Sequence, residues 1–367
     1  MIFKEYSLPE YPAKSDVWEV LAKESRPIAV YGMGNGADKL FRRFEKYGIK
    51  VSEVFASDGF VRGHSFRGFK VKSFSEIKAE YPNFVIVLSF ASNREEVITM
   101  LEGIDREYEM YVPDMPVADE GEYFDREFYN LHYEEIAQVY GMLADRLSKN
   151  LYASVLHYKL SGKMEYLLPF CSQREEIYSL IGKEKVRTVI DAGAYNGDTA
   201  REAIEFFKNL EEIYAIEPDA RNFKKLKKFA ESSDAKIHPI NAAVWSECGS
   251  GSFLESGNRN SSVSSTASHE HKDSEAELIS IDSLGLSGVD YIKYDVEGAE
   301  REALLGSYET VKRESPSLLV SLYHRSRDIF SLPLYLSENF PHYKLYMRRL
   351  RSVPAWELDL IALPQKS

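Results

Sequence analysis

The sequence predicts an α/β protein with two Rossmann-like doubly wound sheets joined by a helical connector. At 367 residues the chain is longer than one hydrophobic core usually organises. A glycine turn follows a strand-like segment twice, after residues 27–31 and after residues 187–192, and the order strand, turn, helix, strand implies a parallel sheet. We therefore expect domains at 1–116 and 186–367, with a connector at 117–185.

Each element is expected from its apolar pattern. In the first domain, residues 27–32, 50–58 and 83–92 are strand-like, and an amphipathic helix ends at Gly48. Apolar residues of the connector recur at a helical spacing, with a helix ended by Gly162. The third segment repeats the alternation, with strands expected at 187–193, 211–219, 235–244, 289–298 and 317–324 and a closing pair at 343–350 and 356–364.

Composition excludes several classes of function. The formal charge of −12 opposes a surface for nucleic acid or anionic lipid, because such surfaces carry an excess of Lys and Arg. The first residues mix charges with prolines, and no apolar run is long enough to span a bilayer, so a cytoplasmic protein is expected. Two distant cysteines, Cys171 and Cys248, support neither a disulfide framework nor a zinc site.

The turn after residues 187–192, which reads DAGAYNGD from Asp191 to Asp198, is rich in carboxylates. Ligands of open parallel sheets bind beyond the carboxyl ends of the strands. A phosphate prefers bare amides there, whereas a carboxylate-rich turn suits a cation such as the sulfonium and ammonium of S-adenosylmethionine. We expect this turn to hold that cofactor through Asp191, Gly193, Ala194, Tyr195, Asn196, Gly197, Asp198 and Thr199.

The two following strands supply further candidates for the cofactor site. Glu217 lies about twenty residues on, at a strand end, where a carboxylate accepts hydrogen bonds from both ribose hydroxyls. Pro218 follows it, and the small residues Ala242 and Ala243 leave room for an adenine ring. A tight turn with an N-cap at Asp198 is the structural alternative.

The stretches VIDAGAYNGDTA, AIEPD, INAAVWSECGSGSF, YIKYDVEGAEREALLGS and PSLLVSLYH together resemble the FkbM family of S-adenosylmethionine-dependent methyltransferases. The resemblance covers the chain from about Val186 onward. It implies a class I methyltransferase fold and O-methylation of hydroxyls on sugars, polysaccharides or related secondary metabolites, a form of carbohydrate modification. Tyr195 departs from many methyltransferases of this fold, which have glycine there.

Methyl transfer to a hydroxyl needs a group that accepts the hydroxyl proton. Asp295, Glu297 and His324 are the candidates, all near the ends of adjacent expected strands. The ordinary pKa of histidine, near 6.5, favours His324 as the base, with Asp295 orienting it or holding the acceptor. Asp295 also lies beside the expected methyl donor, and the sequence allows, without requiring, a divalent cation on Asp295 and Glu297.

Other charged residues are expected to have structural or surface roles, with one candidate ligand contact among them. Glu300 is expected to face the N-terminus of a helix as a dipole partner. The Ser-rich stretch at 255–277 is expected to be a surface loop or lid, with His269 and His271 solvated and not a metal pair. The basic run at 348–351 is a candidate contact for an anionic acceptor.

The first glycine turn, GMGNGA at 32–37, has no acid inside it, so bare amides at a helix start favour a phosphate or diphosphate. The candidate ligand residues are Gly32, Gly34, Asn35, Ala37 and Asp58. Residues 28–58 and FRGFKVKSFSEI resemble the nucleotide-binding front domain of bacterial sugar acyltransferases. This implies a nucleotide-sugar or related ligand; the alternative is a domain that only packs or dimerises.

Three functions are compatible with these patterns. The first is a methyltransferase whose acceptor is a small molecule or a saccharide, either free or linked to a nucleotide. The sequence is compatible with a monomer or a homo-oligomer. The second is an NAD-dependent oxidoreductase using the GMGNGA turn, which leaves Asp191 and Glu217 unexplained. The third is a non-catalytic protein that binds a nucleotide-sugar.

Overall fold

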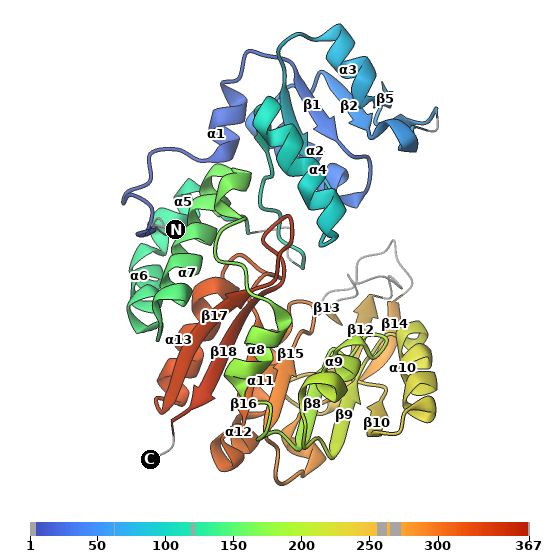
Figure 1. Cartoon of the computed structure of the whole chain (residues 1–367), viewed down its shortest axis with the longest axis vertical. Coiled ribbons are helices and arrows are strands. Elements are labelled where there is room, and N and C mark those ends of the chain that lie inside the picture. Colours follow the sequence, from blue (N-terminus) through green and yellow to red (C-terminus); the bar gives the residue numbers. More distant parts are fainter. Residues whose placement is uncertain (1–4, 62, 119–121, 255–262, 265–272, 366–367) are drawn as a thin grey trace.

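The computed structural model describes residues 5–365 except 62, 119–121, 255–262 and 265–272. Two sheets lie at opposite ends of the molecule, and a group of helices lies beside them (Figure 1). The chain is therefore α/β with largely parallel sheets, as the sequence predicts. Among the described residues, no helix combines the length and the apolar character needed to cross a bilayer.

The N-terminal sheet is parallel and has the strand order β5-β2-β1-β6-β7. Its order reverses between β1 and β6, and every residue of these two strands is buried. Gly48, in the left-handed region with φ of 66°, ends helix α2 as expected. The elements are α1 (Val17–Ala22), β1 (Ile28–Tyr31), α2 (Asn35–Tyr47), β2 (Glu53–Ala56), the 3-10 helix η1 (Asp58–Phe60), β3 (Ser65–Phe66), β4 (Phe69–Lys70), β5 (Lys72–Ser73), α3 (Phe74–Glu80), β6 (Val85–Leu88), α4 (Glu95–Glu107) and β7 (Met110–Tyr111).

The middle of the chain is helical. Asp145 caps the N-terminus of α7 by accepting a hydrogen bond from the amide of Ser148, and Gly162 ends the helix in the left-handed region. The elements are α5 (Arg126–Leu131), α6 (Tyr133–Met142), α7 (Arg146–Ser161), the 3-10 helix η2 (Met164–Tyr166) and α8 (Arg174–Ile181). The helix α7 packs on strand β17 of the C-terminal sheet.

The C-terminal sheet has seven strands in the order β10-β9-β8-β15-β16-β18-β17. The first five are parallel, and β18 runs antiparallel to both of its neighbours, so the expected closing pair is confirmed. The strands are β8 (Thr188–Ala192), β9 (Glu212–Ile216), β10 (Lys236–Ile240), β15 (Tyr291–Tyr294), β16 (Ser317–Ser321), β17 (Tyr343–Arg349) and β18 (Leu358–Pro364). The helices are α9 (Asp198–Phe206), α10 (Ala220–Ser232), α11 (Glu300–Leu305), α12 (Tyr308–Glu314), α13 (Asp328–Asn339) and the 3-10 helix η3 (Asp282–Leu284).

A second, four-stranded sheet follows β10, with the order β11-β14-β12-β13. Its strands are β11 (Ala243–Val244), β12 (Gly249–Leu254), β13 (Val263–Ser264) and β14 (Asp273–Ile279). The expected loop at 255–277 is therefore wrong for residues 263–264 and 273–277, which are strands. His269 and His271 lie outside the described residues.

The N-terminal lobe, which holds the first sheet, and the C-terminal lobe, which holds the seven-stranded sheet, are in direct contact. One apolar cluster joins Leu88 of β6, Leu156 of α7 and Met347 of β17. The turn between β17 and β18 reaches toward the N-terminal sheet (Figure 1), where Ser92 and Val353 exchange two backbone hydrogen bonds of 2.7 and 2.9 Å. The three segments thus pack as one body.

Candidate active site

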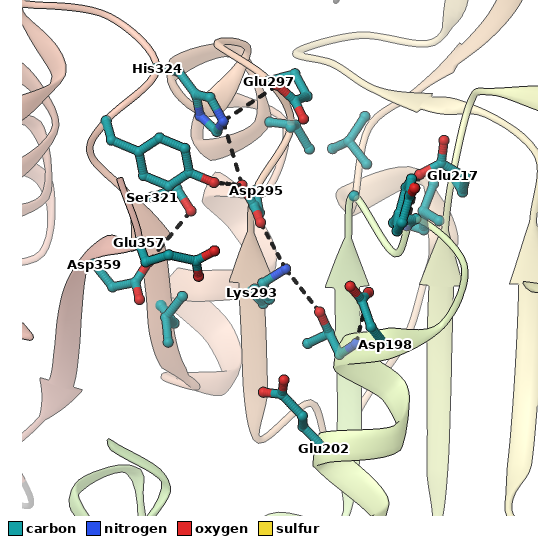
Figure 2. Close-up of a pocket in the computed structure, with 18 of the residues that line it drawn as sticks. Asp198, Glu202, Glu217, Lys293, Asp295, Glu297, Ser321, His324, Glu357 and Asp359 are labelled. Carbon is teal, nitrogen blue, oxygen red and sulfur yellow. Dashed lines mark hydrogen bonds and ion pairs between the residues drawn. The ribbon is translucent and has the colours of Figure 1, made fainter. Parts of the chain in front are cut away.

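A cavity lies at the carboxyl ends of the parallel strands β8, β9, β15 and β16, where ligands of open α/β sheets bind. Figure 2 shows the side chains that line it, with Glu217 on one side and His324 and Glu357 on the other. Its described carboxylates are Asp198, Glu202, Glu217, Asp295, Glu297, Glu357 and Asp359, and its described cationic or basic groups are Arg174, Lys293 and His324. Acids outnumber bases, as the acid-rich turn leads one to expect.

The glycine turn after β8 is shaped by contact with the neighbouring strand. A Cβ atom on Gly193 would lie 1.9 Å from the carbonyl oxygen of Asp295, and the residue has φ of 88°. Tyr195 also has a positive φ, of 47°, which explains why glycine is common at that position. Its amide donates a hydrogen bond of 2.8 Å to Glu217, which fixes the turn against β9.

The predicted cofactor residues divide into two groups. Those in the cavity wall are Gly193, Tyr195, Asp198, Thr199, Glu217, Pro218, Ala243 and Asp295. Those outside the wall are Asp191, Ala194, Asn196, Gly197 and Ala242. Side chains within β8 are fully buried, so Asp191 lies behind the wall and not at the surface of the cavity. In this geometry Asp191 has no surface in the cavity through which it could contact a ligand.

Asp191 instead supports Lys293. Neither of its carboxyl oxygens has a hydrogen-bond partner among the described residues, and Lys293 Nζ lies 3.8 Å from Oδ1. Burial raises the pKa of Asp191 to about 7, against the attraction of Lys293. Lys293 Nζ also donates to Thr199 Oγ1 at 3.0 Å and to Asp295 Oδ2 at 3.1 Å. One ammonium thus ties the start of α9 to the end of β15.

Glu217 lies at the end of β9 with 6% of its surface exposed. Its two carboxyl oxygens accept hydrogen bonds from the amides of Tyr195, at 2.8 Å, and Asp219, at 2.9 Å. A carboxylate has about four acceptor positions, so positions remain for two hydroxyls. Burial raises the pKa of Glu217 to about 7, while the two amides hold it down.

His324 is fully buried among carboxylates. Its Nδ1 lies 2.9 Å from Glu300 Oε1, an ion-pair distance without a hydrogen-bond angle, and its Nε2 lies 3.6 Å from both Asp295 Oδ1 and Glu297 Oε2. Burial lowers its pKa, but the three carboxylates outweigh burial and raise the pKa to about 10. His324 is therefore a cation at neutral pH, and the expectation of an ordinary pKa, on which its role as base depended, is wrong.

Glu297 and Asp295 differ in proton affinity. Burial, with help from Asp295 and Glu300, raises the pKa of Glu297 to about 8. For Asp295, Lys293 and His324 outweigh burial and hold the pKa below its usual range. Tyr323 also donates a hydrogen bond of 3.0 Å to Asp295. Glu297 is thus the carboxylate that readily takes up a proton near neutral pH.

Glu300 begins helix α11, as the sequence predicts, but its role in the site was missed. It is 1% exposed and accepts hydrogen bonds from the amides of Val296, at 2.9 Å, and Gly298, at 3.3 Å. It holds the turn that carries Glu297 and pairs with His324 as well. Together with Asp295 and His324 it forms a group whose ligand atoms lie within 4.8 Å of one another, a spacing compatible with a cation. Only its position three residues after Glu297 hinted at this role.

The far side of the cavity was also missed. Trp356, Glu357 and Asp359 come from the turn and strand after β17, and Arg174 comes from α8. Burial, with Glu357 and Asp295 nearby, holds the pKa of Asp359 well above its ordinary value. This side of the wall is acidic and carries the aromatic ring of Trp356.

The first glycine turn borders a second cavity at the carboxyl ends of β1 and β6. Gly34 and Asn35 line this cavity, whereas Gly32 packs against Ser89 and Ala37 is buried. Asp58 does not line it. The strand β2 ends at Ala56, and both oxygens of Asp58 accept hydrogen bonds from Ser75, so Asp58, named as a candidate ligand residue, is turned away from this cavity.

The basic run at 348–351 is engaged within the protein. Arg348 pairs with Asp145 at 2.7 Å, and the fully buried Arg349 donates to the backbone carbonyls of Leu167 and Ser352. Arg351 pairs with acids of α4, Glu95 and Glu102. The suggestion that this run meets an anionic acceptor is therefore wrong for these three arginines.

Comparison with known proteins agrees with this geometry. Residues 191–352 match the family model described as the methyltransferase FkbM domain. The crystal structure of methyltransferase FkbM from Methylobacillus flagellatus KT is similar over 97% of this chain and 94% of that chain, with a TM-score of 0.69 and 18% identity. That likeness establishes the fold, and its coverage takes in both lobes. No curated protein matches the sequence.

Two further solved structures share only part of the fold. Aeropyrum pernix fibrillarin with bound S-adenosyl-L-methionine is 16% identical over 49% of this chain and 67% of that chain, with a TM-score of 0.32. A putative methyltransferase from Streptococcus mutans in complex with SAH is 11% identical over 52% of this chain and 98% of that chain, with a TM-score of 0.32. Both TM-scores are too low to support an argument. Residues 191–352, which supply most but not all of the residues that line the acid-rich cavity, thus match a methyltransferase FkbM domain.

Proposed function

We propose that the protein transfers the methyl group of S-adenosylmethionine to a hydroxyl of a sugar, polysaccharide or related secondary metabolite. The observation that carries this proposal is the acidic wall of the cavity at the carboxyl ends of β8, β9, β15 and β16. Carboxylates favour a positively charged ligand and repel phosphate. They also accept hydrogen bonds from the hydroxyls of a saccharide.

The residues present fit this cofactor. The turn from Gly193 to Thr199 would receive its amino acid part, and the free acceptor positions of Glu217 would bind the two ribose hydroxyls. Pro218 and Ala243 line the wall beyond Glu217, where an adenine ring would lie. When bound, the cofactor supplies an electrophilic methyl group on a positively charged sulfur.

Glu297 is our candidate for the general base. It lines the cavity, keeps 25% of its side chain exposed and has a pKa near neutrality, which suits proton transfer. In the proposed step, a carboxylate oxygen of Glu297 takes the hydroxyl proton as the acceptor oxygen forms its bond to the methyl carbon. The carbon–sulfur bond breaks at the same time, leaving S-adenosylhomocysteine.

The neighbours of Glu297 position it and the acceptor. Imidazolium His324, held by Glu300, faces Glu297 and Asp295 and keeps both side chains in place. Asp295, held by Tyr323 and Lys293, is placed to accept a hydrogen bond from the acceptor. A divalent cation on Asp295 and Glu297 is allowed by the sequence but not required, and a cytoplasmic location remains a prediction.

The experiment compares Glu297→Gln with wild type. We expect turnover of radiolabelled S-adenosylmethionine with a panel of saccharide acceptors to fall by roughly 10²-fold or more. Calorimetric affinity for S-adenosylhomocysteine should stay within about threefold, because Gln keeps the size of the side chain. Unchanged turnover would remove Glu297 from the mechanism, and no binding of S-adenosylhomocysteine by wild type would overturn the function itself.

The oxidoreductase alternative has lost its main support. A dinucleotide site of this type uses an acid at the end of the second strand for the ribose. Asp58 is turned toward Ser75 and does not line the second cavity. Titration with NAD tests this directly, and we expect no binding.

A further inference from the structure

The second cavity, at the carboxyl ends of β1 and β6, touches the methyltransferase cavity. Val117 and Trp356 line both cavities, so the two spaces meet at these side chains. Nε1 of Trp356 is buried without a hydrogen-bond partner among the described residues. Because that nitrogen has almost no accessible surface, a ligand passing from one cavity to the other would contact the ring of Trp356 and not its N–H.

The two cavities differ in charge. Among its described lining residues the second cavity has no carboxylate, and its one charged side chain is Lys39. The methyltransferase cavity, in contrast, is dominated by acids. An anionic group is therefore favoured in the second cavity and disfavoured in the first, whereas a neutral group rich in hydroxyls suits the first.

The second cavity is large enough for more than a phosphate. Its volume is about 250 Å³, against about 180 Å³ for the methyltransferase cavity. Leu40, Phe90, Met115 and Pro354 give it apolar walls beside Lys39 and Asn35. Apolar walls with a few polar groups suit a flat ring attached to a charged group.

The segment between the cavities is held at both ends. Lys39 Nζ donates hydrogen bonds of 3.0 Å to the carbonyls of Pro116 and Val117. The amides of Val117 and Ala118 in turn donate to the carbonyl of His324, at 3.0 and 3.1 Å. The wall of the second cavity is thus fixed relative to His324, which positions Glu297, as a substrate spanning both cavities requires.

The geometry points to an acceptor that spans both lobes: a saccharide linked to a nucleoside diphosphate. Its diphosphate and nucleoside occupy the second cavity beside Lys39, and its sugar crosses Trp356 and Val117 to reach Glu297. This rests on the proposed function for the identity of the reaction. It adds the class of acceptor and gives the N-terminal lobe the role of holding it.

Gly34 allows a test with a matched control. A Cβ atom there meets nothing within 4 Å, and the residue has the extended conformation of an N-cap, with φ of −100°, so Asp and Asn both fit. Gly34→Asp adds a negative charge to the cavity wall, and Gly34→Asn adds the same shape without the charge. Both variants should melt at or above the wild-type temperature.

The probes are UDP, UDP-glucose and inorganic pyrophosphate, titrated by calorimetry in the presence of S-adenosylhomocysteine. We expect UDP and UDP-glucose to bind wild type and Gly34→Asn alike, and to bind Gly34→Asp and Lys39→Met roughly tenfold more weakly or worse. Trp356→Ala should weaken both probes, and UDP-glucose more than UDP, since Trp356 lines the second cavity and the sugar must also cross it.

Three results overturn the inference: no binding of UDP or UDP-glucose, equal binding by Gly34→Asp and Gly34→Asn, or pyrophosphate binding as tightly as UDP. S-adenosylhomocysteine is titrated separately in every variant. If it binds while the UDP probes fail, this inference alone is wrong. If it does not bind wild type, the proposed function fails, whatever the UDP probes do.

Discussion

The protonation of Glu297 should control how tightly the cavity binds a sulfonium. Burial raises the pKa of Glu297 to about 8 in the free protein, so most of these side chains are neutral at pH 7. A cation within about 4–6 Å of a carboxylate lowers its pKa by roughly 1–3 units. The complex with S-adenosylmethionine therefore binds fewer protons at Glu297 than the free protein does.

The sign and size of the effect follow from linkage. Affinity for S-adenosylmethionine is low while Glu297 is protonated in both states, rises with pH, and levels off above about pH 8. Each unit by which the sulfonium lowers the pKa gives about a tenfold gain in affinity, or about 1.4 kcal/mol. We expect a gain of roughly tenfold or more between pH 6 and pH 9.

S-adenosylhomocysteine supplies the internal control, because it lacks the charge on sulfur. Asp191 and Glu217 both have a pKa of about 7, but Asp191 lies behind the wall and Glu217 would bind the ribose, which the two ligands share. Their contributions cancel in the ratio of the two dissociation constants. Calorimetry at half-unit pH steps gives the Kd of S-adenosylhomocysteine divided by the Kd of S-adenosylmethionine. This ratio should rise with pH in wild type and stay constant in Glu297→Gln. A flat ratio in wild type, or a slope that persists in the variant, refutes the reasoning.

Three more predictions concern the cluster around the turns. Gly193→Ala should lower the free energy of unfolding, measured by urea titration, by about 2 kcal/mol or more, because its Cβ would meet the carbonyl of Asp295. It should also abolish binding of S-adenosylhomocysteine. Gly249→Ala, which has open space around it, is the control and should change neither property. For His324→Gln, the folded-state pKa of about 10 lies above the ordinary value, so the stability that the imidazolium contributes is complete below about pH 6.5 and is lost toward pH 10. Thermal melts should show the gap between wild type and this variant closing over that range, and a constant gap would mean that His324 is not a cation. Dialysis against EDTA should leave turnover unchanged, because His324 already places a positive charge beside Asp295 and Glu297; turnover lost on dialysis and restored by Mg²⁺ would place a metal there.

The sequence predicted the parts of the site that lie just after strands. Asp295 and Glu217 follow β15 and β9 directly, and the carboxyl ends of parallel strands meet at one edge, so their approach to the Gly193 turn follows from the strand pattern alone. The same reasoning failed for Asp58, because β2 ends at Ala56 and a 3-10 turn redirects the chain.

What the sequence did not predict depends on contacts between distant segments. The turn that carries Trp356 and Glu357 reaches the cavity only because β17 and β18 add an antiparallel pair to the sheet. The pKa of His324 depends on three carboxylates around a fully buried ring, and the sequence alone shows neither the burial nor the contacts. Only the folded arrangement turns the expected base into a cation.

The bonds from Val117 and Ala118 to the carbonyl of His324 have a consequence for protein engineering. Exchanging the N-terminal lobe for that of a relative, in search of a new acceptor, would replace the residues that support the reaction centre if the imported segment extended past residue 116. A chimaera should therefore retain 112–118 from the recipient and import only what precedes it. Libraries aimed at new nucleotide carriers would then vary the walls around Lys39 and leave residues 112–118 unchanged.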